Sequence, residues 1–552
     1  MRFSPQVHTQ RGDQASCLGE MLLVQIFVIY LLVATCLYTR LRVGTAIFPL
    51  GIVAGAMLCI RANNIRLWLK TFFVTLLCWL AAIIAGAVIT DGSYDGNAYH
   101  QEIVAAILRG WYPGGDQLPD IPLSLWSLHY AKGIEMTEAA VASFVGLMEA
   151  GKAVNFILGI SAAAFVYGFT ASEMRPRNRA ALWLAAIAVI ANPVYLCQSA
   201  SFYIDYAKYI FTLITIIMLL EIGAAPKKMR NYMLLFVVIS LSVATKFNSF
   251  FEEGVTIFAA MLWWICHRQW KTAITTGFLA AGAVIFTIAI PAYHPYITNL
   301  IENGHPLFPL MGEGSVDIMT GNTPPDYMQY DRFTNFFRSL FTPALPAIDS
   351  RTGGFGILMP LLLIISACTI WRGRRIADGL PIYAGLWIIA SCFFFEQSWW
   401  ARYICQLWIF VVMGTVFAGS RRVNYRKAGI LMWIMGIAVI LNGLTGIART
   451  GGAILRQHAY RSAVTSTLKG RSVRISGLNE AYVRQLEEKD IEAIPVDISD
   501  TTSFRLAYYG LTSSPESYPV MHLDSADYVT IIRKLEQLPF DYSENIARTS
   551  QE

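Results

Sequence analysis

The sequence predicts an α-helical polytopic membrane protein that ends in a small soluble α/β domain. Hydrophobic residues make up 55% of the 552 residues and charged residues only 14%, and the mean hydropathy is +0.47. Apolar runs long enough to cross a bilayer recur through the first 447 residues, whereas the tail is polar. This composition outweighs the length-based expectation of several soluble domains. We therefore expect a transmembrane domain over 1–447 and a soluble domain over 448–552.

The predicted spans are apolar runs of roughly 17–25 residues, the length that a bilayer requires. We expect about thirteen, with the number in the first 90 residues open by one or two. The polar N-terminus leads into an apolar run without a small-residue cleavage site, which favours a retained first helix. The spans lie near 21–39, 44–60, 67–90, 153–172, 180–198, 207–222, 231–246, 253–267, 273–292, 354–371, 380–396, 402–419 and 428–447.

The distribution of basic residues predicts the orientation of these spans. If the spans alternate, five basic clusters fall on one side, which the positive-inside rule makes cytoplasmic. Arg40 and Arg42 lie on the other side and are an exception. That side also receives the long loops 91–152 and 293–353, the turns 199–206 and 397–401, and the tail. The clusters are Arg175/Arg177/Arg179, Lys227/Lys228/Arg230, Arg268/Lys271, Arg372/Arg374/Arg375 and Arg421/Arg422/Arg426/Lys427.

Composition and motifs exclude several functions. The net charge of +6 comes from these loop clusters, so the bilayer, and not nucleic acid, is the expected partner. Eight of the nine cysteines lie in apolar runs, with Cys17 in the leader, and no CxxC or Cys/His spacing predicts a disulfide framework or a metal site. A GxxxxGK[ST] phosphate loop is absent from the sequence, which argues against ATP-driven transport. No cofactor is expected.

The soluble tail alternates strand and helix patterns. We expect strands over 472–475 and 491–496, a helix over 480–488 and a second helix near 528–538. The tail contains neither cysteine nor a Gly-rich phosphate loop. A structural or acceptor-positioning role is therefore favoured over catalysis.

Polar and charged residues crowd the segment 90–113, directly after the third predicted span. If a helix begins near position 97, Asp95, Tyr99, Glu102 and Arg109 lie near one face of it. Two interpretations are open. An aspartate here can cap the helix, or a carboxylate held at the mouth of a helix bundle can serve chemistry.

Other residues of the same segment fit either interpretation. Asp91 is a second candidate for a cap, and His100 lies next to the predicted face. Trp111 and Tyr112 suit the headgroup level of a bilayer, which predicts a helix lying flat on the membrane surface.

The segment carries a family resemblance. An apolar helix, Asp-x-x-x-Tyr-His, a surface helix and Gly-Trp-x-Pro follow in the order that resembles the first extracytoplasmic loop of the GT-C superfamily. These membrane glycosyltransferases, which include protein O-mannosyltransferases and aminoarabinose transferases, use polyprenyl-phosphate-linked sugars. The resemblance implies that Asp95 is the catalytic base, with Asp91 as the fallback. Tyr99, His100 and Glu102 are supporting candidates for substrate binding.

Four further segments resemble motifs of the same superfamily: 129–136 (HYAKGIEM), 244–248 (ATKFN), 303–310 (NGHPLFPL) and 400–403 (WARY). The resemblance of the segments 244–248 and 400–403 implies basic positions at helix ends that hold the lipid phosphate. Because a departing phosphate needs cations, Lys132, Lys246, His305 and Arg402 are candidates for that role. Lys246 and Arg402 rank highest because both lie at predicted extracytoplasmic helix ends. A basic residue at such an end can also simply extend its charge to the interface, so both interpretations stay open.

Two smaller questions concern the remaining acidic residues. Asp205 and Lys208, in the turn 201–209, could pair with each other, but an interfacial aromatic belt is the favoured interpretation of that turn. Asp91, Asp95 and Glu102 are oxygen ligands that a divalent metal would accept. No spacing demands a metal, and none is predicted.

The leading hypothesis is a glycosyltransferase of the bacterial inner membrane, either a hexosyl- or a pentosyltransferase. It would move a sugar from a polyprenyl-phosphate donor to a glycan, lipid or protein acceptor at the extracytoplasmic face, with inversion and Asp95 as general base. The alternatives are a flippase or transporter of a lipid-linked saccharide, and a polysaccharide polymerase or ligase. Transporters tend to carry internal repeats and midplane charges, and neither is evident in this sequence.

Overall fold

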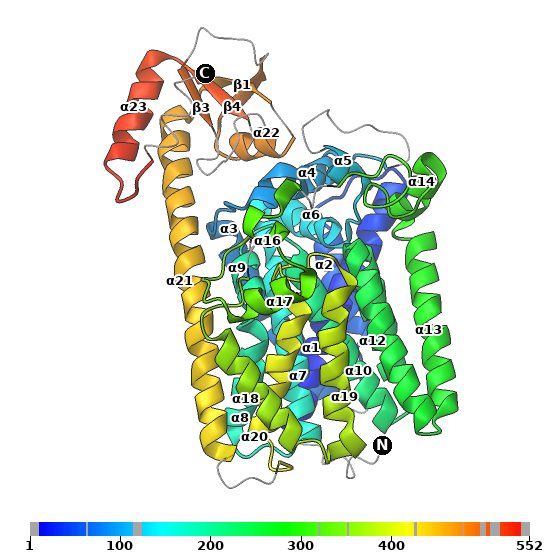
Figure 1. Cartoon of the computed structure of the whole chain (residues 1–552). Helices are drawn as coiled ribbons and strands as arrows, with labels where there is room; N and C mark the ends of the chain where they lie inside the picture. Colours follow the sequence, from blue (N-terminus) through cyan, green and yellow to red (C-terminus); the bar gives the residue numbers. More distant parts are fainter. Residues whose placement is uncertain are drawn as a thin grey trace.

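The computed structural model contains a helix bundle with a small α/β domain at one end (Figure 1). It describes residues 10–61, 64–113, 124–317, 321–349, 353–423, 428–477, 480–496, 504–507 and 519–542. In these ranges, seven helices are long and apolar enough to cross a membrane. They are α1 (Gln10–Tyr38), α3 (Ile65–Val88), α7 (Ala153–Glu173), α10 (Asp205–Ala224), α12 (Phe247–Cys266), α13 (Trp270–Ala289) and α21 (Ala428–Leu468).

Six shorter apolar helices complete the bundle in the described residues. Every one of the thirteen predicted apolar runs contains a helix, so the polytopic helical class is confirmed, while the number of complete spans stays a prediction. The shorter helices are α2 (Ile47–Leu58), α8 (Arg179–Ile190), α11 (Met229–Thr245), α18 (Met359–Arg372), α19 (Leu380–Ser391) and α20 (Trp408–Gly419).

Helix α1 lies inside the bundle. Small residues let neighbouring helices approach it closely, and one buried side-chain amide forms hydrogen bonds with them. A Cβ on Gly55 of α2 would lie 2.7 Å from the Cα of Gln25 on α1, so the two helices can approach only because that residue is glycine. The buried Gln25 amide donates to the Ile52 carbonyl at 3.2 Å and accepts from the Trp79 indole at 3.0 Å. Close packing and buried hydrogen bonds are what hold helices together in lipid.

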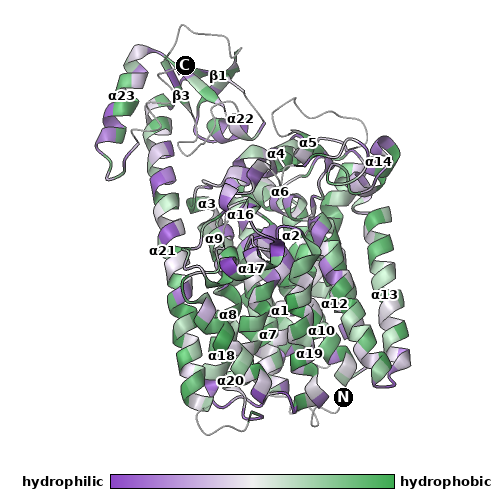
Figure 2. Cartoon of the chain, in the orientation of Figure 1, coloured by the Kyte–Doolittle hydropathy of each residue, from purple (hydrophilic) through white to green (hydrophobic). Residues whose placement is uncertain are grey.

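The two ends of the bundle differ in charge. Short connections at one end carry the five predicted basic clusters, of which Arg426 and Lys427 lie outside the described residues (Figures 1 and 2). We call this the basic end. Two clusters meet there, because Arg177 donates to the Val423 carbonyl at 2.7 Å and Arg421 donates to the Arg177 carbonyl at 2.9 Å. The exceptional Arg40 lies at the opposite end, 4.2 Å above the Tyr112 ring.

The opposite end, which we call the cavity end, is covered by short helices from the first long loop. They are η2 (Gly96–His100), α4 (Gln101–Arg109), α5 (Ser124–His129), α6 (Gly133–Val145) and η3 (Met148–Lys152). The helix predicted to begin near position 97 is present. The prediction that it lies flat on the membrane surface is wrong, because α4 is buried from Gln101 to Ile107 and packs between α6 and the C-terminal domain. Trp111 is buried against His294.

Further short helices fill the remaining connections. They are α9 (Pro193–Gln198), α14 (Tyr293–Asn303), α16 (Pro325–Met328), α17 (Arg332–Phe341), η4 (Ile376–Gly379), η5 (Cys392–Phe394) and η6 (Cys405–Leu407). Of these, α14, α16 and α17 belong to the second predicted long loop, 293–353.

Helix α21 joins the bundle to the C-terminal domain without a break. It runs past position 447, where we place the domain boundary, to Leu468. Tyr460, Val464 and Leu468 at its far end are buried in the core of the C-terminal domain. The last helix of the bundle is therefore also the first helix of the soluble domain.

The C-terminal domain contains a four-stranded sheet of order β2-β1-β4-β3 within the described residues. Strand β1 pairs parallel with β2, with Val473 opposite Ala493, and antiparallel with β4, with Ile475 opposite Met521. The predicted strands and helices are confirmed as β1 (Ser472–Ser476), α22 (Glu480–Glu487), β2 (Glu492–Pro495) and α23 (Ser525–Glu536). Strands β3 (Phe504–Ala507) and β4 (Val520–Leu523) were not predicted. All four residues of β4 are buried, so it lacks the alternation that marks a strand.

Candidate active site

A cavity of about 420 Å³ lies at the cavity end of the bundle. Its wall combines residues that are far apart in the sequence: the start of η2, helix α5, the junction of α11 and α12, the segment 310–349 and the turn before η6. The polar lining residues are Tyr94, Asp95, Tyr99, Tyr130, Thr245, Lys246, Asn248, Asn322, Asp349, Gln397, Arg402 and Tyr403.

Asp95 faces this cavity from the N-terminal end of η2. Within the described residues, its side chain makes no capping hydrogen bond to the helix. Its carboxylate instead accepts a hydrogen bond from Arg402 Nη1 at 2.8 Å. A capping role for the Asp95 side chain is therefore excluded within the described residues, while its role as a catalytic base stays a prediction.

Arg402 lies at the centre of the charged residues of the site. In addition to Asp95, its guanidinium lies 3.5 Å from Asp349 and 3.7 Å from Asp205, and it donates to the Tyr403 hydroxyl at 3.2 Å. Burial alone would lower the pKa of Arg402, but Tyr403, Asp95 and Asp205 hold it well above its usual value. The guanidinium is therefore a permanent cation.

Lys246 supplies the second cation. It is the single extended residue between α11 and α12, with φ −155° and ψ 140°, so the chain turns there and presents the side chain to the cavity. Its ammonium is ion-paired with Asp205, the first residue of α10. Asp205 is buried and also accepts from the Gln198 amide at 3.2 Å. One carboxylate thus holds both cations.

The predictions for the turn 201–209 are wrong on both counts. Asp205 pairs with Lys246 and Arg402, not with Lys208, which forms a buried ion pair with Glu252 at 2.7 Å. The aromatic side chains of the turn do not form an interfacial belt, because Tyr206 and Tyr209 are fully buried. The close approach of α11, α12 and the turn before η6 supplies charged partners that the local sequence does not contain.

The site thus combines two cations, Lys246 and Arg402, with three carboxylates, Asp95, Asp205 and Asp349. Asp205 is enclosed, whereas Asp95, Lys246 and Arg402 line the cavity. An anion that entered would meet both cations and would compete with Asp95 for the guanidinium. The Asp95 carboxylate released in this way would be available to another partner in the cavity.

Of the other predicted site residues, only Tyr99 lines the cavity. Asp91 is buried behind it and accepts from the backbone amides of Ser93 at 2.8 Å and Phe202 at 3.0 Å. His100 is buried, and its Nδ1 forms a hydrogen bond with the Glu135 carboxyl at 2.7 Å. Asp91 and His100 therefore hold the backbone of the Asp95 loop in place.

Glu102, Lys132 and His305 also lie away from the cavity lining. Glu102 accepts from the Ala481 amide of the C-terminal domain at 3.0 Å. Lys132 donates to the carbonyls of Leu128 and Tyr130 at 2.9 and 2.6 Å, and burial lowers its pKa to about 7. His305 Nδ1 accepts from the Leu307 amide at 3.1 Å. The structure gives each of them a contact within its own loop or with the soluble domain.

Sequence reasoning missed several residues that line or support the cavity. Asp205 could have been selected from the sequence, because it is an acidic residue at a predicted extracytoplasmic helix end. The sequence analysis considered Lys208 as its partner, whereas the structure pairs it with Lys246 and Arg402. Asn248 and Tyr403 lie inside two motifs that resemble the superfamily without having been selected. Asp349 had no signal, because nothing in its neighbourhood predicts a contact with the turn that carries Arg402.

No group of three or more His, Cys, Asp or Glu side chains that could hold a metal ion occurs in the described part of the chain. Asp91 and Glu102, which were considered as oxygen ligands beside Asp95, face the protein interior and the C-terminal domain instead. Independence from a metal stays a prediction.

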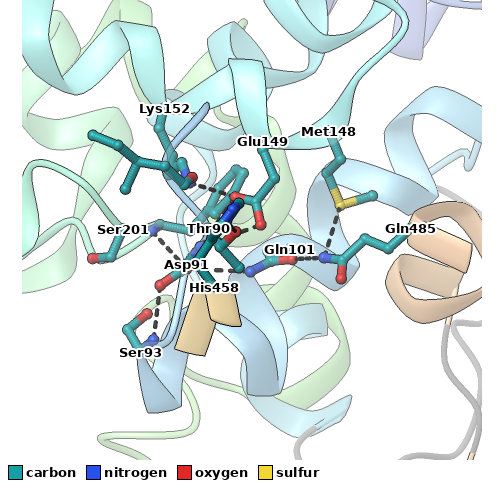
Figure 3. A network of polar contacts seen from close by, with 12 residues as sticks. Thr90, Asp91, Ser93, Gln101, Met148, Glu149, Lys152, Ser201, His458 and Gln485 are labelled. Atoms are coloured by element: carbon teal, nitrogen blue, oxygen red, sulfur yellow. Dashed lines mark hydrogen bonds and ion pairs between the residues drawn. The ribbon is translucent and has the colours of Figure 1, made fainter. Parts of the chain in front are cut away.

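The C-terminal domain holds the Asp95 loop from behind. Arg461, on the part of α21 that extends from the bundle, donates to the Asp91 carbonyl at 2.9 Å, to Asn97 Oδ1 at 3.1 Å and to Glu149 at 3.2 Å. Figure 3 shows Asp91 within the same polar network, which runs through Gln101 to Gln485 of α22. The contacts enclose both ends of the turn on which Asp95 lies.

Replacing Arg461 tests this positioning role. In Arg461→Gln, the Asp91 carbonyl and Asn97 lose buried charged hydrogen bonds, each worth about 1.5–3 kcal/mol. For the reaction proposed below, we expect the rate to fall while the affinity for a phosphate-bearing ligand is retained, because the Arg461 contacts described above are with Asp91, Asn97 and Glu149. Equal losses in turnover and affinity would contradict a role limited to positioning the loop. Lys469→Gln, an exposed cation directly after the same helix, is the control.

The contact between α4 and α22 should depend on pH. Burial raises the pKa of Glu102 and of Glu488, each to about 7. Since both values lie above the ordinary carboxyl pKa, the docked state binds protons more tightly, and its stability falls as pH rises from about 4.5 through 7. Hydrogen exchange of α22 amides, corrected for intrinsic rates, should therefore be faster at pH 8 than at pH 5.5. The double substitution Glu102→Gln and Glu488→Gln should remove the difference; exchange that slows with pH would contradict it.

Comparison with known proteins gives two solved structures. This chain is similar to the crystal structure of ArnT from Cupriavidus metallidurans bound to undecaprenyl phosphate, with a TM-score of 0.48 and 12% identity. The similarity covers 78% of this chain and 87% of that one. For the apo structure of the same protein the TM-score is 0.46 and the identity 11%, and the similarity covers 81% of this chain and 96% of that one. No family model and no curated protein sequence matches. No residue of this chain is assigned from these similarities.

Proposed function

We propose that this protein is an integral membrane glycosyltransferase that moves one sugar from a polyprenyl-phosphate-linked donor to a glycan, lipid or protein acceptor. One observation carries the proposal: the carboxylate of Asp95 and the cations of Lys246 and Arg402 share one cavity. The transfer needs a group that accepts a proton and groups that hold a phosphate. Helices that can cross a membrane surround the cavity and would hold the lipid tail of the donor.

In the proposed reaction, Asp95 takes the proton of an acceptor hydroxyl while the hydroxyl oxygen bonds to the anomeric carbon of the sugar. The bond between that carbon and the phosphate oxygen breaks, and its electron pair leaves with the polyprenyl phosphate. Arg402 and Lys246 stabilise the additional negative charge on the phosphate. Because the acceptor attacks opposite the leaving group, the configuration at the anomeric carbon inverts.

The cavity has the size and the walls that a sugar requires. Its volume of about 420 Å³ lies in the usual range of ligand pockets, about 300–1,000 Å³. The aromatic side chains of Tyr99, Trp126, Tyr130 and Trp400 line it. Flat rings with a polar atom at one edge can pack on the apolar face of a sugar and leave its hydroxyl groups to hydrogen bonds.

The proposed compartment follows from the charge of the two ends. Short connections rich in lysine and arginine normally stay in the cytoplasm, and those of this chain gather at the basic end (Figure 1). The cavity and the C-terminal domain would then face the periplasm of a bacterial inner membrane. A polyprenyl carrier could present its phosphate there while its tail remains in the bilayer.

A transfer assay tests the proposal. The purified full-length protein in phospholipid vesicles is incubated with a labelled polyprenyl-phosphate sugar and with glycan, lipid and protein acceptors. We expect one labelled sugar on an acceptor, free polyprenyl phosphate, and the opposite anomeric configuration by NMR. Movement of the donor across the bilayer without transfer would overturn the proposal in favour of a flippase. Joining of whole saccharide blocks would overturn it in favour of a polymerase or ligase.

A further inference from the structure

Helix α17 has an apolar face that the protein covers only in part. Phe333, Phe337 and Phe341 recur every four residues and form one stripe along the helix. Their side chains are 51, 56 and 52% exposed. The neighbouring Phe336 and Leu340 are buried. The apolar arc of α17 is thus wider than the surface against which it packs.

Polar contacts fix the rotation of α17, so the stripe cannot turn inward. The buried Asn335 amide donates to the carbonyls of Tyr327 at 2.7 Å and Tyr330 at 3.1 Å. Asp331 caps the helix by accepting from the Phe333 amide at 2.9 Å. Arg338 donates to the Asp326 carbonyl at 3.0 Å. Of these residues, Asn335 lies on the arc of the helix opposite the phenylalanine stripe.

The stripe lies where the bundle helices end. The rings of Phe333 and Phe336 lie 4.8 and 4.7 Å from the ring of Phe393, which follows α19, and α17 also contacts α18. Phe394, which follows Phe393, and Leu361, on α18, are also exposed. Figures 1 and 2 show α17 at the level where the mostly hydrophobic part of the bundle gives way to polar loops. The stripe therefore continues the lipid-facing surface of the bundle.

The charges beside the stripe fit the headgroup layer. Arg332 is exposed next to Phe333, and Arg338 lies 4.3 Å over the ring of Tyr330. Helices that lie in the interface of a bilayer combine an aromatic apolar face with basic residues that reach lipid phosphates. Leaving three phenylalanines in water would forgo about 1.5–3 kcal/mol for each side chain that could be buried.

The same segment forms part of the cavity wall. Asn322 precedes α17 and Asp349 follows it, and both line the cavity. A Cβ on Gly353 would lie 2.9 Å from the Ser339 carbonyl oxygen of α17. The Gly353 carbonyl in turn accepts from the Ala401 amide at 3.2 Å, next to Arg402. Helix α17 is thus linked through Gly353 to the residue that precedes Arg402.

We propose that α17 is an interfacial helix whose Phe333, Phe337 and Phe341 insert among the phospholipid chains of the leaflet at the cavity end. The partner is the bulk phospholipid of that leaflet, because the stripe continues the lipid-facing surface and is flanked by arginines. The cavity wall is then anchored at the membrane surface. Insertion itself does not depend on the proposed function. If that function holds, the anchor places the cavity at the depth of the donor phosphate.

Photo-crosslinking tests the proposal. The photoreactive p-benzoylphenylalanine, which is close in shape to phenylalanine, is introduced in place of Phe337, Phe278 or Asp326 of the full chain. Phe278, exposed on the span α13, is the positive control, and Asp326, exposed on α16 before α17, is the negative control. Each protein is placed in vesicles of phosphatidylethanolamine and phosphatidylglycerol, irradiated, and analysed by mass spectrometry of its peptides.

We expect phospholipid adducts on the acyl chains at positions 337 and 278, and none above background at 326. Adducts at 278 alone would overturn the proposal, because the stripe would then lie in water. Crosslinks at 337 to a second copy of the chain would overturn it in favour of a dimer contact. The readout is independent of sugar transfer, so a failed transfer assay would leave this result unaffected.

Discussion

Asp95→Asn should abolish sugar transfer while leaving the donor site intact. A general base contributes about 10²- to 10⁴-fold to a rate, and asparagine cannot accept the acceptor proton. The fold should persist, because Arg402 keeps its contacts with Asp205 and Asp349. Since Asp95 competes with an incoming phosphate for Arg402, binding of polyprenyl phosphate should be unchanged or tighter. We expect the turnover number to fall by this factor at unchanged or lower donor KM.

The matched control for this experiment is Glu313→Gln, which removes an exposed carboxylate from the second long loop at the same end of the protein. It should transfer sugar at the wild-type rate. Transfer that survives Asp95→Asn intact would remove Asp95 from the role of base. Loss of donor binding together with turnover would mean instead that Asp95 orders the site and does not act on the acceptor proton.

Arg402→Gln should have the second large effect, on binding of the donor. The substitution removes the cation that contacts Asp95 at 2.8 Å and leaves Asp205 and Asp349 near it with less positive charge. Losing one partner of a buried charged pair costs about 3–5 kcal/mol, so the melting temperature should fall as well. Binding of polyprenyl phosphate, measured by calorimetry in detergent, should weaken by at least about 30-fold, the equivalent of about 2 kcal/mol.

Arg402→Lys separates the loss of binding from the loss of stability. A lysine keeps the positive charge but cannot present the planar fork of a guanidinium to a phosphate. This variant should fold near the wild-type stability and still bind the donor more weakly. Acceptor KM should change less than donor KM in both variants, and the opposite order would exclude a phosphate-binding role. Lys469→Gln, an exposed cation at the end of α21, serves as the control.

The proximity of Asp95 and Arg402 has a consequence for the order of the reaction. A carboxylate held 2.8 Å from a guanidinium has its lone pairs directed at the cation. A donor phosphate that engages Arg402 would release Asp95 toward the acceptor. The base would thus become available when the donor is in place, which would protect the site from unproductive proton transfer.

The membrane architecture could be predicted from the sequence in detail. Hydropathy is a property of consecutive residues, so each apolar run identified a helix, and the basic clusters identified the end of the bundle that carries them. The choice of Asp95 also came from a local motif. Where a prediction needed a neighbour distant in the sequence it failed, as with α4, whose partner α22 begins at Glu480, and with the burial of Trp111.

The candidate site itself shows where sequence information ends. The sequence alone determined that Asp95, Lys246 and Arg402 each follow or precede an apolar helix at the same end of the bundle. Only the tertiary structure decided that Asp95 meets a cation 307 residues away, that Asp205 holds Lys246 in place of Lys208, and that Glu102 faces the soluble domain. Ion pairs form between whichever helix ends the packing brings together, and packing depends on side-chain shapes along whole helices, which no local pattern contains.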